Sequence, residues 1–149
     1  MSAQPFAHGL PDPVARADFY DGVATRRLLA WLADVVLILV LCLLILPFTA
    51  FTGIFFFPAL MLVTGFLYRW ATLAGGSATW GMRLMGIELR EGDGGRLHGA
   101  TAFWHTLAYT LAVAMAPLQL VSVLMMALTP RGQGLGDSLL GTAAINRPL

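Results

Sequence analysis

The sequence has no lysine, a single cysteine and few charged residues, and the last two shortages each exclude a class of protein. Only 11% of its 149 residues are charged and 58% are hydrophobic, whereas an average soluble domain has about 25% charged and about 45 to 50% apolar residues. Such a chain has too little polar surface for a soluble globule. The one cysteine, Cys42, excludes an internal disulfide and a cysteine-based metal site. We interpret it as a small lipid-facing or packing residue.

Motifs for catalysis, cofactor binding and nucleic-acid binding are also missing. A nucleic-acid interface needs clustered cations, and outside the apolar runs only Arg26 and Arg27 are adjacent. The segments GSATWG and GDGG fit neither a phosphate-binding loop nor a dinucleotide fingerprint, and the three histidines lack metal-ligand spacing. We therefore expect a protein that is not an enzyme and has no cofactor, no metal and no nucleic-acid partner.

Three apolar runs are long enough to cross a bilayer, which requires about 20 residues per helix. They cover about residues 28–46, 50–68 and 104–128, and the uncharged PFTAFTG makes the first two a tight hairpin. Pro117 interrupts the third run, which leaves two alternatives: one span with the C-terminus outside, or a broken hairpin that returns it to the cytoplasm. The predicted fold class is an all-α polytopic membrane protein, with the lipid bilayer as its surroundings.

Polar segments flank these runs. The N-terminal tail of residues 1–24 has prolines and scattered charges, which indicates disorder or a position on the surface, and the first helix starts near Thr25. In the surface segment 69–103, MGIELREGDGGRL alternates apolar and polar residues around a DGG turn, which predicts a small β-hairpin. In the C-terminal motif 129–147, TAAIN is a candidate short strand.

The arginines predict the orientation. Three arginines precede or open the first helix, none lies in the first loop, and four lie in the second. By the positive-inside rule, the N-terminus and the surface segment face the cytoplasm.

Asp34 is the one acidic residue inside an apolar run. It follows Arg27 by seven positions, so the two share a helix face, about 10 Å apart. An isolated carboxylate at such depth costs on the order of 2.5 to 3.5 kcal/mol, so it must be partnered, hydrated or protonated. Two interpretations stay open: a proton or cation site, or a hydrogen-bonded residue that fixes helix packing. We favour the second, because three helices enclose no water path without an oligomer or a partner.

The other polar residues near the membrane receive structural interpretations. Arg69 is typical of an interface anchor, and His105 of an interfacial histidine bonded to backbone or water rather than a proton shuttle. Gln119 and Ser122 lie three apart on one helix face and are expected to join helices. A solvated loop face is expected for the acids of the surface segment, which are Glu88, Glu91 and Asp93.

Three separated motifs, taken in order, resemble the RDD family of bacterial integral membrane proteins, which is named for one arginine and two aspartates. They are Arg27 with Asp34 in the first run, GGSATWGMRLMGIELREGDGGRL after the second, and RGQGLGDSLLGTAAI near the end. The resemblance covers about residues 20–147. Matched residue by residue, the arginine is Arg27, with Arg26 as the alternative, and the aspartates are Asp34 and Asp137.

The chain departs from the family pattern at three positions. Met82 stands where a lysine is usual, His105 where an arginine commonly opens the last span, and Gly136 where a histidine is frequent. Arg83 and His105 are therefore secondary candidates for the polar site. Two cationic positions are lost or weakened, which favours a divergent member with a structural role.

The resemblance implies a multi-pass inner-membrane protein and suggests proton-coupled cation transport by an oligomer, through a cluster of Arg27, Asp34 and Asp137. If these three meet on one membrane side, the third run is broken, the C-terminus is cytoplasmic, and TAAIN pairs with GIEL. The alternative is a non-transporting accessory or assembly subunit of a larger membrane complex, in which the cluster only locks the fold. The glycines and aromatics of FTGIFFFPALMLVTGFLY suit such close helix contacts.

Overall fold

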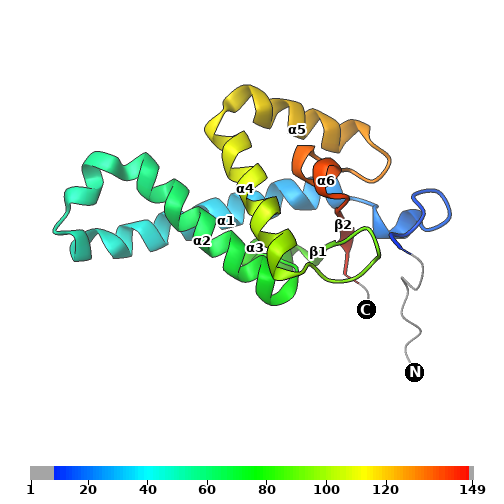
Figure 1. The fold of residues 1–149 in the computed structure, drawn as a ribbon, viewed down its shortest axis with the longest axis horizontal. Helices are drawn as coiled ribbons and strands as arrows, with labels where there is room; N and C mark the ends of the chain where they lie inside the picture. Colours follow the sequence, from blue (N-terminus) through cyan, green and yellow to red (C-terminus); the bar gives the residue numbers. More distant parts are fainter. Residues whose placement is uncertain (1–8, 148–149) are drawn as a thin grey trace.

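The computed structural model describes residues 9–147, most of which lie in helices (Figure 1). The two long helices are α1 (Val23–Ile45) and α2 (Phe57–Gly76). They belong to two helical segments that are long and apolar enough to cross a membrane. The remaining elements are η1 (Ala17–Phe19), η2 (Leu46–Thr49), η3 (Thr52–Phe56), α3 (Trp80–Met85), β1 (Ile87–Arg90), α4 (Gly99–Ala114), α5 (Ala116–Leu128), α6 (Leu135–Leu140) and β2 (Ala143–Asn146).

Helices α1 and α2 form the predicted hairpin, with shifted boundaries. Helix α1 begins at Val23, two residues before the expected Thr25, and its N-cap is Gly22 at φ 67°. Positive φ angles at Ala50 and Phe51 separate η2 from η3 and help to reverse the chain. Helix α2 therefore starts later than predicted and also runs further, to residue 76 instead of 68.

The third apolar run is broken, as one of the two alternatives for Pro117 required. Helices α4 and α5 meet at Met115 and are bent by 118°. Met115 has non-helical backbone angles, with φ −116° and ψ 88°. A proline at position 117 has no N–H to donate to the preceding turn, which permits this break. The run is therefore two short helices rather than one straight span.

The prediction of a β-hairpin within the surface segment is wrong. Strand β1 pairs antiparallel with β2, with Ile87 opposite Asn146 and Arg90 opposite Ala143. The separate expectation that TAAIN pairs with GIEL is confirmed. After β1 the chain does make a tight turn, but Leu97 then donates its N–H to the Ser77 hydroxyl at the end of α2 instead of returning along β1. The edge of β1 is thus left for the apolar C-terminal strand, which is buried there.

Much of the expected N-terminal tail packs against this sheet. Phe19 of η1 is buried against Ile145 of β2, and the side chain of Asn146 donates hydrogen bonds to the carbonyls of Asp18 and Asp21. Most of residues 9–22 are exposed, so of the two interpretations of the tail they agree with a position on the surface, and residues 1–8 lie outside the described part of the chain.

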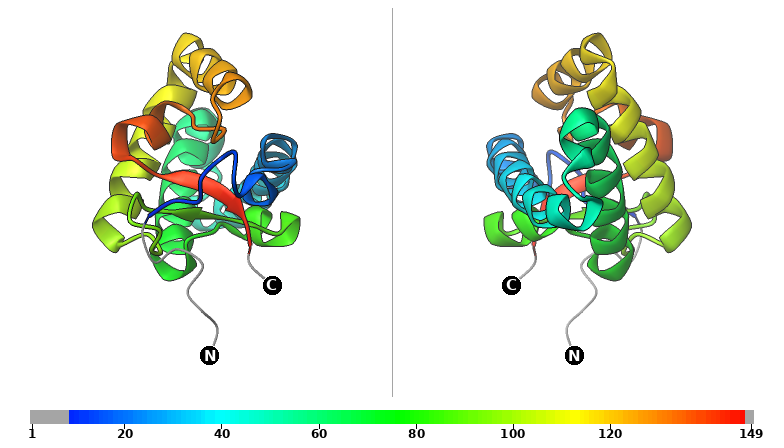
Figure 2. Two further views of the ribbon diagram at one scale, coloured as in Figure 1. Left: turned by 90° about the vertical axis from the view of Figure 1, so that its right-hand side faces the viewer. Right: turned by 90° about the vertical axis from the view of Figure 1, so that its left-hand side faces the viewer.

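The sheet, α6 and the start of α1 gather at one end of the molecule, and the α1–α2 hairpin projects from the other (Figure 1). Strand β2 runs from α6 towards the start of α1 (Figure 2), where Arg26 donates to the Asn146 side chain over 3.0 Å. Buried apolar residues connect α1, the end of α2, α3, α4 and the sheet: Val23, Ala30, Leu73, Ala78, Met82, Ile87, Leu89, Leu97, Ala102 and Ala144. This core fixes the relative positions of the polar residues described next.

Candidate functional site

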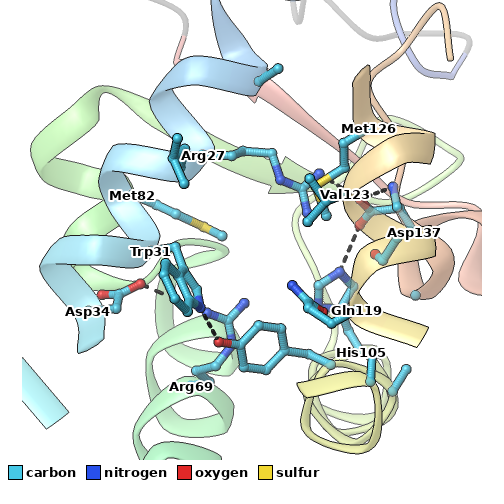
Figure 3. A pocket seen from close by; sticks show the side chains of 18 of the residues that line it. Arg27, Trp31, Asp34, Arg69, Met82, His105, Gln119, Val123, Met126 and Asp137 are labelled. Atoms are coloured by element: carbon cyan, nitrogen blue, oxygen red, sulfur yellow. Dashed lines mark hydrogen bonds and ion pairs between the residues drawn. The ribbon is translucent and has the colours of Figure 1, made fainter. Parts of the chain in front are cut away.

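The structure places the three predicted residues around one cavity, but in two ion pairs. Asp137 pairs with Arg27, and Asp34 pairs with Arg69 rather than with Arg27. All four side chains line a cavity of about 340 Å³ between α1 on one side and α4 and α5 on the other (Figure 3). The site is therefore a cavity with an ion pair at each of two positions on its wall.

Asp137 is completely buried and accepts four hydrogen bonds. Arg27 Nη1 donates to Oδ2 over 2.6 Å, and the Gly134 N–H donates to the same oxygen over 3.1 Å. His105 Nε2 lies 2.7 Å from Oδ1, and the Thr142 hydroxyl donates to Oδ1 over 3.0 Å. Burial alone would raise the pKa of Asp137, but the charge of Arg27 and the contact with His105 outweigh it and hold this pKa well below its ordinary value. The carboxylate is thus charged and fully paired.

The local sequence explains how Asp137 reaches this position. It is the third residue of α6, so its carboxylate folds back to the N–H of Gly134, which caps the helix. A Cβ on Gly134 would lie 2.6 Å from Ser122 Oγ and 2.6 Å from Met126 Cε, so a larger residue here would displace these α5 side chains. Ser122 accepts the N–H of Leu135 over 3.1 Å. The expected role of Ser122 in joining elements is confirmed by this bond.

Asp34 is held mainly by uncharged donors. The Tyr68 hydroxyl and the Gly81 N–H donate to Oδ1 over 2.7 and 2.9 Å, and the Thr79 hydroxyl donates to Oδ2 over 2.6 Å. Arg69 Nη1 lies 3.9 Å from Oδ2, which is an ion pair but too long for a hydrogen bond. Asp34 therefore lies buried among α1, α2 and α3 and joins these three helices.

Helix α3 is shaped to approach Asp34 closely. Thr79 caps it, because its hydroxyl accepts the Met82 N–H over 3.2 Å while donating to Asp34. A Cβ on Gly81 would lie 2.3 Å from the Ala30 carbonyl oxygen and 2.7 Å from Asp34 Oδ1. Only glycine at this position allows α3 to contact α1.

Arg69 is the residue whose role the sequence interpretation missed. It is 4% exposed, so its interpretation as an interface anchor is wrong. Its guanidinium lies 3.8 Å from the centre of the Tyr109 ring, whose hydroxyl accepts the Trp31 indole N–H over 2.7 Å. Arg69 and Leu73 lie one turn apart and are the buried residues of α2. Their helical spacing was the one feature of the sequence that could have placed Arg69 on the buried face.

The two secondary candidates occupy different places. His105 is buried and its Nε2 bonds to Asp137 rather than to backbone or water, while its Nδ1 has no hydrogen-bond partner among the described residues. Arg83 is exposed, lies beside Gly76 at the end of α2, and is not among the residues that line the cavity. The structure therefore brings His105 into the site and leaves Arg83 outside it.

Glu88 also differs from its prediction as a solvated loop residue. It is buried in β1, accepts a hydrogen bond from Arg90 Nε over 2.7 Å and lies 3.5 Å from Arg147 Nε. Glu88 thus helps to hold the two strands together, outside the cavity. Glu91 is partly buried and pairs with the exposed His98.

Cys42 is buried in α1, which agrees with a packing role.

The helical fold, the two long apolar helices and the buried ion pairs define a small membrane protein. Residues 22–141 match the sequence model of the RDD family, which is most of the chain, and the chain belongs to that family. The resemblance seen in the sequence is thereby confirmed. Comparisons with curated proteins and with solved structures found no match.

Proposed function

We propose that this RDD-family protein is a non-catalytic, non-transporting accessory subunit of a larger complex in the bacterial inner membrane. The observation that carries the proposal is the saturation of both carboxylates. Asp34 accepts three hydrogen bonds beside its ion pair, and Asp137 accepts four. A cation carrier needs carboxylate oxygens that exchange partners, whereas a structural lock needs oxygens that are all paired.

The proposed orientation has the sheet end in the cytoplasm. Residues 35–68, which include the far end of the hairpin, contain no charged side chain. The opposite end, at η1, the start of α1, α3, the sheet and the connecting loops, carries the arginines other than Arg69: Arg16, Arg26, Arg27, Arg83, Arg90, Arg96, Arg131 and Arg147. The positive-inside rule then favours this end as cytoplasmic. Because β2 pairs with β1, the C-terminal strand lies on the same side.

The far half of the α1–α2 hairpin supplies the docking surface in this proposal. No other described helix lies beside it (Figure 1). Its tip exposes four aromatic side chains, Phe48, Phe51, Phe55 and Phe56. Large exposed apolar surfaces mark lipid or protein contacts. A larger membrane protein would cover this hairpin.

Co-purification tests the proposal. The wild-type protein, extracted in a mild detergent, is expected to bring a stoichiometric membrane partner. Phe55→Ser at the hairpin tip should release that partner without lowering the melting temperature. Leu139→Ser on α6 is the matched control, because Leu139 is 77% exposed and Phe55 is 81% exposed. A monomer without any partner, or equal effects of the two variants, contradicts the docking role.

Proton-coupled cation transport by a homo-oligomer is the second candidate, and one observation favours it. Both ion pairs border the same cavity, so a carboxylate that changed partners would open towards it. Reconstituted wild-type protein would then show cation-dependent proton flux that disappears in Asp34→Asn. This outcome would replace the accessory role.

A further inference from the structure

The cavity between α1 and α5 is lined by both polar and apolar side chains. Its volume of about 340 Å³ lies within the range of small-molecule sites, about 300 to 1,000 Å³. Leu28 of α1 and Val123 of α5 line it and are 57% and 48% exposed. The cavity is therefore open beside these two residues, which belong to apolar helices that lipid would surround.

Two polar side chains of the cavity, Arg69 and Gln119, have unpaired hydrogen-bond donors. Asp34 and Asp137, the two acids that line the cavity, are already saturated. The guanidinium of Arg69 donates no hydrogen bond to any described residue, and Arg69 Nε is buried without a partner. The Gln119 amide also has no hydrogen-bond partner in residues 9–147, and both side chains point into the cavity, from α2 and α5 (Figure 3). Donors of Arg69 and Gln119 are thus free to bind a ligand that brings its own acceptor.

A buried guanidinium without an acceptor is costly, because each unmet polar group loses its hydration on burial. Arginine has five donors in a planar fork that matches a carboxylate or a phosphate with two parallel bonds. Asp34 compensates the charge of Arg69 only from 3.9 Å, whereas Arg27 contacts Asp137 at 2.6 Å. Arg69 is therefore the less compensated cation of the two.

Beside its polar residues, the cavity has an apolar lining from α1, α3, α4 and α5, which includes Leu28, Met82, Ala108, Ala112, Val123 and Met126. A small inorganic anion bound to Arg69 and Gln119 would leave this apolar lining uncovered. An acyl chain attached to the anionic group would cover it, and such molecules are abundant in a bilayer.

We propose that this cavity binds an amphipathic anion, a carboxylate or phosphate group on an acyl chain. The anionic group is held by Arg69 and Gln119, and the chain leaves between Leu28 and Val123. The inference goes beyond the accessory role and does not depend on it, since a bound amphiphile is compatible with either candidate function.

Quenching of Trp31 fluorescence by brominated lipids tests the proposal, because Trp31 lines the cavity. The other tryptophans are removed by Trp70→Phe, Trp80→Phe and Trp104→Phe, and a melting curve verifies the fold. In a non-ionic detergent, dibrominated stearic acid is expected to quench Trp31 saturably. Its uncharged methyl ester should quench no more than a brominated detergent does. Equal quenching by acid and ester would overturn the proposal.

Four substitutions, one of them a control, locate the binding. Val123→Phe should weaken binding by about tenfold or more by filling the mouth, whereas Val121→Phe should not, since Val121 is similarly exposed (45% against 48%) but does not line the cavity. Gln119→Leu removes a donor without breaking a hydrogen bond among the described residues, so it should preserve the fold and weaken binding. Arg69→Lys keeps the charge beside Asp34 but removes the fork, and should also weaken binding. Identical affinities in Val121→Phe and Val123→Phe would contradict the site.

Competition distinguishes the sources of the anionic group. Displacement of the brominated acid by phosphatidylglycerol but not by phosphatidylcholine identifies an anionic phospholipid. Displacement by unbranched fatty acids alone identifies a free carboxylate. Displacement by inorganic phosphate at equal potency would show that the acyl chain contributes nothing, which overturns the amphiphile proposal.

Discussion

The two buried carboxylates have similar surroundings but differ in how close their arginines lie. Asp137 contacts Arg27 at 2.6 Å, and this pair joins α1 to the C-terminal motif. Asp34 is satisfied by Tyr68, Thr79 and Gly81, and its arginine lies 3.9 Å away. At the Asp137 centre, the carboxylate and the arginine are therefore in direct contact. At the Asp34 centre, the carboxylate is hydrogen-bonded but the guanidinium of Arg69 keeps unpaired donors.

This difference indicates separate roles for Asp34 and Asp137, although the family name groups the two aspartates together. The Asp137 centre fixes distant parts of the chain, since its donors come from α1, α4 and the segments around α6. The Asp34 centre fixes α3 against α1 and positions Arg69 at the cavity. Substitutions at the first centre should therefore affect stability most, and substitutions at the second should affect stability less and the cavity more.

Asp137→Asn is expected to have the largest effect. It removes a charge from a direct, buried pair and leaves Arg27 uncompensated, which should cost about 3 to 5 kcal/mol of the free energy of unfolding. Asp34→Asn should cost less, about 1 to 3 kcal/mol, because most partners of Asp34 are neutral. Denaturation in mild detergent, followed by tryptophan fluorescence, gives both values. A larger loss in Asp34→Asn would reverse the comparison.

Gly81→Ala should have the next largest effect and act on the Asp34 centre alone. The added methyl would meet the Ala30 carbonyl oxygen at 2.3 Å, so α3 must move away from α1. The expected cost is about 1 to 3 kcal/mol. Gly75→Ala is the control, since a Cβ there meets nothing within 4 Å, and it should be neutral or slightly stabilising. Similar melting temperatures for the two variants would argue against the tight α1–α3 contact.

The pH dependence of stability should be governed in part by Asp137. Its pKa is lowered in the folded protein from an ordinary value of 3.8, so its contribution is complete above that value and is lost as the pH falls below it. The loss amounts to at most about 1.4 kcal/mol per pH unit for one group. Unfolding measured from pH 6 downwards should show a shallower decline in Asp137→Asn than in the wild type. Identical slopes would show that Asp137 does not titrate with folding.

Removal of single hydroxyl donors should have the smallest effects. Thr142→Val removes one of four donors to Asp137, and Tyr68→Phe removes one of three to Asp34. Each should cost about 1 kcal/mol, with Tyr68→Phe the larger because fewer donors remain. Melting temperatures in the same detergent check the order. If Thr142→Val were the more damaging, the Asp137 centre would be less redundant than its four bonds indicate.

The elements that follow from local composition were predictable from the sequence. The leucine-rich runs, Pro117 as a break and TAAIN as a strand all reflect patterns within a few residues. Residues chosen through the family resemblance, Arg27, Asp34 and Asp137, also line the cavity. Their pairing was not predictable, because it depends on how α2 is rotated against α1, and a single sequence does not reveal that angle.

The errors share a physical cause, which is competition from distant parts of the chain. The DGG turn forms, but Ser77 and the buried C-terminal strand determine what the flanking residues contact. Arg69 was predicted to be an interface anchor because two aromatic residues flank it, but in the structure it contacts Asp34 of α1 and Tyr109 of α4. Glu88 was predicted to be solvated, but in the structure it is buried and pairs with Arg90 and Arg147. Local sequence patterns do not register such partners.

We infer that the two carboxylates hold the fold together and do not carry ions. The decisive experiment measures proton flux into liposomes that contain the purified wild-type protein, driven by a gradient of sodium or potassium. No flux above that of empty liposomes is expected. Flux that is present in the wild type and absent in Asp34→Asn, while Asp34→Asn still melts cooperatively, would contradict it.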